Sequence, residues 1–189
     1  MDNLSWVVDE CIGELGKSVA PCDLLERLFA DPRCPAFGAD HHFIVGACLL
    51  TALASAKGDS GETLLSRLSE LGVRSSSVPG AACARWGVCG AGVSAGMAYA
   101  IASGNEPLKE NGWAEGQKMV ALIGLAIADA GAPRCCKRDS RIAVEVAAGI
   151  FERDFCVSFP SPEPRKARCA FSEANAVCLR ENCSYYENR

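Results

Sequence analysis

The sequence has no excess of basic residues. Lysine and arginine total 19 against 23 aspartates and glutamates, which gives a net charge of −4 and a pI of about 5.3. Nucleic-acid-binding domains normally carry a basic stripe, so no nucleic-acid partner is expected. The N-terminus also lacks the basic segment and apolar run of a secretory signal, which predicts a cytoplasmic location.

The common catalytic fingerprints are missing as well. The chain contains no P-loop, no nucleotide-binding glycine fingerprint and no interpretable Ser/His/Asp order. No convincing strand pattern is present, because the alternation at residues 155–159 is short and stops at Pro160. These absences leave the substrate, the reaction and the oligomeric state open.

Helical periodicity is what the chain does contain. Hydrophobic residues make up 49% of the 189 residues, enough for one domain with a core. Helical spacing or an uncharged run bounded by turn residues occurs at 4–15, 21–29, 41–56, 64–71, 86–105, 113–130 and 141–155. We predict an all-α protein of about seven helices: one bundle-like domain over residues 1–157, with a linker and cysteine-rich tail over 158–189 packed on it.

The segment 86–105 has no charged side chain, and its length also suits a membrane span. Most of its residues are glycine, alanine or serine, and Gly92 and Gly96 would let a neighbouring backbone approach closely. We therefore expect a buried helix and no membrane contact.

Twelve cysteines are the most unusual part of the composition. In a cytosolic chain, cysteines that do more than pack are usually metal ligands or reactive thiols. The tail pattern Cys169-x8-Cys178-x4-Cys183 lies in a polar segment too small to bury three thiols, which favours a metal site with Cys156 as a candidate fourth ligand. An iron–sulfur cluster or zinc suits thiolate ligands. The alternative is a set of reduced cysteines without a function.

A glycine-rich turn carries Cys89, followed by Gly90 and Gly92. If a helix begins here, the free backbone N–H groups and the positive end of the helix dipole favour a thiolate. The Gly-x-Gly spacing also resembles an anion cradle, so Gly90 and Gly92 are candidate cofactor-binding positions. Glycines placed for close helix packing explain the pattern equally well.

The adjacent pair Cys135-Cys136 is a stronger candidate. Their Cα atoms are about 3.8 Å apart, too close for a relaxed disulfide. Arg134 precedes the pair, and Lys137, Arg138 and a predicted helix follow it. Cationic neighbours and a helix N-terminus both lower the pKa of a thiol. We therefore predict at least one reactive or metal-bound thiolate here, with Arg134 binding a cofactor. The competing interpretation is a solvated basic turn.

The two histidines of the chain, His41 and His42, are adjacent at a predicted helix start. Neighbours on a helix point about 100° apart, so they would not chelate one ion together. His41 is a candidate ligand or general base, or else a capping or surface residue. Because alternate helix starts gather at one end of a bundle, His41, Cys89 and Cys135 are expected to share one catalytic pocket.

These residues also carry a family resemblance. The ordered set His41-His-Phe43, Trp86-Gly-x-Cys-Gly-Ala91, Gly131-x-Pro-Arg-Cys-Cys-Lys-Arg138 and the tail cysteines resembles an uncharacterised cysteine-rich domain family of bacteria and archaea, over roughly residues 40–187. Relatives are sometimes joined to methyltransferase or radical-SAM-type domains, often in anaerobes, which implies iron–sulfur or thiol chemistry. The tail departs from the family pattern, with Cys183-Ser-Tyr-Tyr where relatives tend to have Cys-Pro followed by aromatics.

Two functional hypotheses follow. The first is a metal–thiolate protein, iron–sulfur rather than zinc, with redox or sulfur-transfer activity at Cys89, Cys135 and Cys136. The second is a non-enzymatic accessory domain in which the tail holds structural zinc and the helical surface docks on a partner enzyme such as a methyltransferase.

Overall fold

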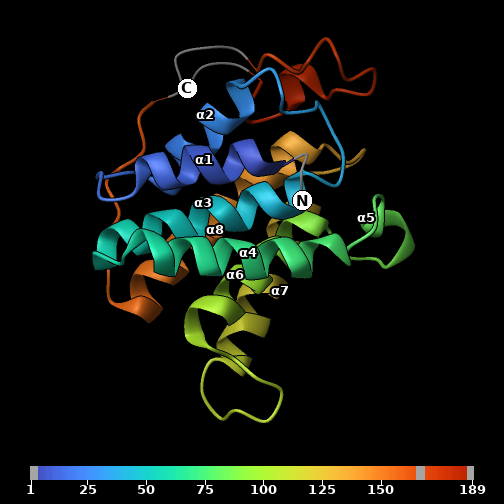
Figure 1. The fold of residues 1–189 in the computed structure, drawn as a ribbon. Helices are drawn as coiled ribbons and strands as arrows, with labels where there is room; N and C mark the ends of the chain where they lie inside the picture. The colour runs from blue at the N-terminus through green and yellow to red at the C-terminus, as the bar shows by residue number, and fades with distance from the viewer. Residues whose placement is uncertain (1–3, 165–168, 187–189) are drawn as a thin grey trace.

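The fold is seen in a computed structural model that describes residues 4–164 and 169–186 (Figure 1). Within these residues the regular elements are eight α-helices and the 3₁₀ helix η2, and no strand is present. Their bounds are α1 (Ser5–Glu14), α2 (Pro21–Ala30), α3 (His41–Lys57), α4 (Gly61–Ser76), α5 (Ala82–Arg85), α6 (Gly90–Ser103), α7 (Trp113–Asp129), α8 (Cys136–Phe155) and η2 (Arg180–Asn182). The predicted all-α class is confirmed.

Helix α3 is the centre of the fold. Every residue from 41 to 54 is buried, and the helix contacts α1, α2, α4, α6 and α8. A helix that is apolar on all sides is stable only when other elements surround it. Figure 1 shows α3 enclosed in this way, with α1 and α2 on one side and α6 and α7 on the other. Cys48 and Cys11 are completely buried in this core as small apolar residues.

Small residues allow α6 to pack closely against its neighbours. The backbone N–H of Gly46 on α3 donates to Ser94 Oγ on α6 at 2.9 Å. A Cβ atom at Gly96 would lie 2.7 Å from Val120 Cγ2 on α7, so only glycine fits there. The uncharged segment is therefore a packed helix. Among the described residues, no helix is long and apolar enough to cross a membrane.

Two helix boundaries each lie five residues from the expected position. Helix α4 continues to Ser76 and is followed by the single turn α5, in a stretch expected to be a loop. The hydroxyls of Ser75 and Ser76 donate to carbonyls three residues earlier, which suits the end of a helix. Helix α8 begins at Cys136, five residues before the expected start. Its first turns, residues 137–141, are charged or polar but buried, so apolar periodicity gave no signal for them.

The C-terminal segment lies against the helices. Backbone N–H of Glu163 donates to the Asp23 carboxylate on α2, at 3.0 and 3.2 Å to its two oxygens. Further along, the Tyr185 hydroxyl donates to Glu145 on α8 at 2.6 Å. Figure 1 accordingly shows the red C-terminal segment, within residues 169–186, beside α2. Helix α8 therefore carries candidate residues at its start and supports the tail along its length.

Candidate thiol site at three helix N-termini

The first turns of α3, α6 and α8 meet around a small cavity of about 50 Å³. Its lining combines thiols, imidazoles, one arginine and one carboxylate with small residues: Gly38, His41, His42, Ala81, Ala82, Cys83, Cys89, Gly90, Ala91, Arg134, Cys136, Asp139 and Ser140. Three helix N-termini pointing at one space provide a positive electrostatic potential and free backbone N–H groups. The site therefore favours a negatively charged sulfur or a small anion.

The structure brings together most of the residues expected at a shared pocket. His41, Cys89, Gly90, Arg134 and Cys136 all line the cavity. The two remaining candidates, Cys135 and Gly92, are at the starts of the same helices but outside the lining. Cys135 instead occupies the N-cap position of α8. Cys135 was expected at the shared pocket because a helix was predicted to follow it. Cys136 lines the cavity instead, since it is the first residue of α8.

His41 is positioned as an uncharged base. Its Nδ1 lies 3.1 Å from the carbonyl oxygen of Gly38, and because a carbonyl only accepts, Nδ1 carries the proton. Burial, and then the positive charge of Lys137, lower the pKa of His41 to about 3, so the ring is neutral near pH 7. The lone pair is therefore on Nε2. That atom is buried and has no hydrogen-bond partner in the described part of the chain.

Ser140 provides a second unpartnered polar atom at the same cavity. Its side chain is completely buried, and its Oγ lacks a hydrogen-bond partner among the described residues. Buried polar groups without partners are rare and costly in native proteins. An acceptor on His41 and a hydroxyl on Ser140 together suit a small guest that both donates and accepts hydrogen bonds. The cavity volume admits a guest of a few atoms at most.

His42 also lines the cavity, and it supports the start of α6. Its Nδ1 lies 3.4 Å from the carbonyl oxygen of Val78, and its ring packs directly on the backbone of Gly90. A Cβ atom at Gly90 would lie 2.1 Å from His42 Nε2, closer than any real contact. Gly90 is therefore required so that α6 can begin against the imidazole. Asp40 occupies the N-cap position of α3, but its side chain makes no capping hydrogen bond.

Burial outweighs the helix dipole at two of the candidate thiols. The N–H groups of Ala91 and Gly92 act to lower the pKa of Cys89, but desolvation raises it to about 11. Burial likewise raises the pKa of Cys135, in spite of the N–H groups of Arg138 and Lys137. The expectation of a lowered pKa was therefore wrong for Cys89 and Cys135. It counted the favourable dipole and neglected desolvation.

Among the described thiols that line the cavity, Cys136 is the one that accepts a hydrogen bond from a cationic side chain. Arg134 Nη1 donates to Cys136 Sγ at 3.2 Å. The other two basic residues of the motif turn elsewhere: Lys137 Nζ contacts Cys34 Sγ, and Arg138 donates to the carbonyls of Gly131 and Pro133. Of the three expected cationic neighbours, Arg134 is therefore the one that donates a hydrogen bond to a cavity thiol.

Sequence reasoning missed three lining residues with thiol, carboxylate or hydroxyl side chains: Cys83, Asp139 and Ser140. Cys83 belongs to α5, where a loop was expected. Asp139 and Ser140 belong to the first turn of α8, which was expected to begin after them. Asp139 is buried in an ion pair with Arg138 at 3.1 Å, and burial raises its pKa. The signal was available, because Asp139 and Ser140 are three and four residues after Cys136 and so share its face on a helix that begins there.

The tail cysteines do not assemble with Cys156. Cys156 ends α8 in a left-handed conformation, with φ 53°, whereas Cys169 Sγ lies 3.6 Å from Arg141 in the second turn of that helix. Most of the length of α8, roughly 20 Å at 1.5 Å per residue, separates these two positions. Cys178 Sγ accepts from the backbone N–H of Arg180.

No group of three or more His, Cys, Asp or Glu side chains in the described residues is placed to hold a metal ion. The arrangement therefore does not fit a four-cysteine iron–sulfur or zinc site that includes Cys156. Zinc or iron–sulfur binding by the tail stays a prediction, and no chemistry below passes through it.

These features define an all-α protein in which three thiols, those of Cys83, Cys89 and Cys136, line a small cavity at converging helix N-termini. The chain belongs to DUF5714, a family of unknown function, which it matches over residues 8–186. The resemblance to an uncharacterised family is thus confirmed, and the match extends to the N-terminal helices beyond the expected residues 40–187. Searches of curated proteins and of solved structures found no match.

Proposed function

We propose that the protein is a reactive-thiol protein whose centre is Cys136 in the cavity between α3, α6 and α8, and that sulfur transfer is its reaction. One observation carries this proposal: thiols, a neutral imidazole acceptor and three helix N-termini line the same cavity. Helix N-termini and an arginine stabilise negative charge on a sulfur-borne anion.

Sulfur transfer suits the size and the charge of this cavity. In the reaction, Cys136–SH and a donor R–S–SH exchange one sulfur atom and give Cys136–S–SH and R–SH, so no external oxidant is consumed. The terminal S–H group of a persulfide is small enough for this cavity. It donates a hydrogen bond when it is protonated and accepts hydrogen bonds when it is ionised. His41 Nε2, with its low pKa, is an acceptor for the S–H hydrogen bond of the persulfide. The first-turn N–H groups and Arg134 favour the ionised form.

The neighbouring thiols complete this proposal. Cys83 and Cys89 line the same space, and of the two Cys83 is the thiol that can receive a sulfur atom carried on Cys136. The raised pKa of Cys89 keeps that thiol protonated and unreactive at neutral pH. Docking on a methyltransferase or radical-SAM-type partner stays a prediction, because neither the fold nor the family match bears on it.

The test determines which cysteine carries the persulfide. Protein prepared anaerobically is treated with inorganic polysulfide, alkylated and mapped by peptide mass spectrometry. We expect the persulfide on Cys136, although Cys156 is the more exposed cysteine. Cys136→Ser should remove the modification, and Arg134→Gln should reduce it.

The matched control is Cys156→Ser, which should leave persulfidation of Cys136 unchanged. Modification that follows exposure alone, with Cys156 as the main product, would refute the proposal. Retention of the full signal in Cys136→Ser would refute it as well.

A further inference from the structure

A second sulfur site involves Lys137, the residue after Cys136 in the first turn of α8. Lys137 is completely buried, and its Nζ lies 2.9 Å from the sulfur of Cys34, a residue 103 positions earlier in the chain. Cys34 is in the loop after α2 and is 6% exposed. No carboxylate among the described residues forms an ion pair with Lys137, so the thiol is its hydrogen-bonding partner.

Two aromatic rings hold the amine in place. Nζ lies 3.9 Å from the ring centroid of Phe29 and 4.1 Å from that of Phe171. A buried ammonium normally needs a carboxylate, because ring faces and a thiol repay little of its desolvation. Burial lowers the pKa of Lys137, which increases the fraction present as the neutral, nucleophilic amine. Burial also raises the pKa of Cys34, so a neutral thiol–amine pair is the form that this setting favours.

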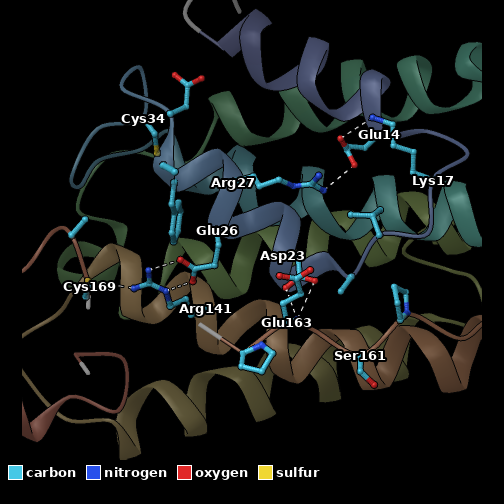
Figure 2. Close-up of a pocket in the computed structure, with 18 of the residues that line it drawn as sticks. Glu14, Lys17, Asp23, Glu26, Arg27, Cys34, Arg141, Ser161, Glu163 and Cys169 are labelled. Carbon is cyan, nitrogen blue, oxygen red and sulfur yellow. Dashed lines mark hydrogen bonds and ion pairs between the residues drawn. The ribbon is translucent and has the colours of Figure 1, made fainter. Parts of the chain in front are cut away.

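The thiol is reachable by a small molecule. Cys34 lines an open cleft of about 990 Å³ between α2 and the C-terminal segment, together with Phe29, Arg141 and Cys169. Figure 2 shows Cys34 at one end of this cleft, near the Arg141–Glu26 ion pair. Arg141 donates to Glu26 and to Cys169 Sγ, whereas the amine of Lys137 donates to Cys34 Sγ. A small uncharged oxidant therefore has a route to the pair.

We propose that Cys34 and Lys137 form an oxidative modification site, at which dioxygen links the two side chains through a single oxygen atom as Sγ–O–Nζ. A direct S–N bond would require the two atoms to approach to bonding distance, whereas one bridging oxygen fits near the separation they already have. The link would tie the loop after α2 to the start of α8.

The atoms and electrons balance with dioxygen as the only oxidant. Sulfur and nitrogen each lose two electrons, and dioxygen accepts all four. One of its oxygen atoms becomes the bridge. The other leaves as water, together with the thiol proton and one proton of the neutral amine. Reduction by a dithiol reverses the step and restores the thiol and the amine, with the bridging oxygen lost as water.

The experiment compares wild-type protein purified in air with protein purified anaerobically. Both samples are denatured, alkylated without reductant and digested with trypsin. In the air-exposed sample, the peptide 34–57 should be joined to the peptide 135–138, with a mass equal to their sum plus one oxygen and minus two hydrogens. Cleavage after Lys137 should be blocked in that product. Treatment with dithiothreitol should release both peptides, and the anaerobic sample should lack the product.

Variants assign the two linked atoms. Cys34→Ser and Lys137→Met should each abolish the product. Cys22→Ser removes a partly buried thiol on α2 and should leave the product unchanged. The wild-type comparison stands without them if either variant fails to fold. Absence of the product after air exposure overturns the proposal. A linked mass without the extra oxygen also overturns it, because that mass indicates a disulfide to the Cys135-Cys136 pair or a direct S–N bond.

Discussion

Substitution of Gly90 by alanine tests the central contact of the site. The added methyl would lie 2.1 Å from His42 Nε2, 2.2 Å from Cδ2 and 2.7 Å from Cε1. Ordinary contact begins at 3.4 Å, so the imidazole would have to retreat by roughly 1.3 Å. The ring is buried at 8% exposure, and its Nδ1 interacts with the Val78 carbonyl. It therefore has little room to move.

The expected cost follows from these contacts. Inserting a methyl group into a packed site costs about 1–3 kcal/mol, and weakening the His42–Val78 hydrogen bond adds at most about 1 kcal/mol. Alanine regains part of this, up to about 1 kcal/mol, by its better helix propensity, and less at a first helical position. Gly90→Ala should therefore lower the free energy of unfolding in urea by about 1–3 kcal/mol. The slope of that free energy against urea concentration should not change.

Gly124 on α7 provides the matched control. It is exposed, lies inside a helix and has no atom within 4 Å of an added Cβ. Gly124→Ala should raise the free energy of unfolding by about 0.5–1 kcal/mol. In a His42→Ala background, where the imidazole is absent, Gly90→Ala should lose most of its cost. Stabilisation by Gly90→Ala alone, or an equal cost in both backgrounds, would show that the contact with His42 is not the cause.

Three further predictions concern protonation, a buried hydroxyl and the lysine of the α8 start. The folded pKa of His41 is about 3 and its ordinary value is 6.5, so the unfolded chain takes up a proton first as the pH falls. The free energy of unfolding should therefore decrease from about pH 6.5 towards pH 3, by up to about 1.4 kcal/mol per pH unit from this residue. His41→Gln should reduce this pH dependence, as measured by urea unfolding at several pH values. Tyr99 donates to Asp154 at 2.9 Å while its ring packs on Phe151, so Tyr99→Phe should cost about 1 kcal/mol in thermal or urea unfolding, and a cost near zero would show that this hydrogen bond is not formed. Lys137→Met keeps the apolar stem and removes a buried amine, so it should leave stability unchanged or increase it by about 1–3 kcal/mol; a large loss would instead show that the contacts of Lys137 with Phe29 and Phe171 stabilise the fold.

Most of the helices could be predicted from the sequence, because the spacing of apolar residues and the residues at helix ends act locally. Pro21 at the start of α2 and Gly58 after α3 act through their own backbone geometry, with Gly58 at φ 68°. The uncharged run of α3 has no polar face, so a central position for it was predictable. The start of α8 was harder to place, since Lys137, Arg138 and Arg141 resemble a solvated turn in the sequence but are buried in the structure.

The sequence alone determined that this chain forms helices, that three of them begin at cysteines or histidines, and which family it resembles. Those properties depend on residue spacing and on neighbours in the chain. Tertiary structure decided which thiol faces the cavity, because the direction of Cys136 relative to Cys135 follows from where α8 begins. It also decided the ionisation of the thiols, since desolvation at Cys89 depends on packing by distant segments. The pairing of Lys137 with Cys34 joins residues 103 positions apart, and only the folded arrangement of α2 against α8 brings them into contact.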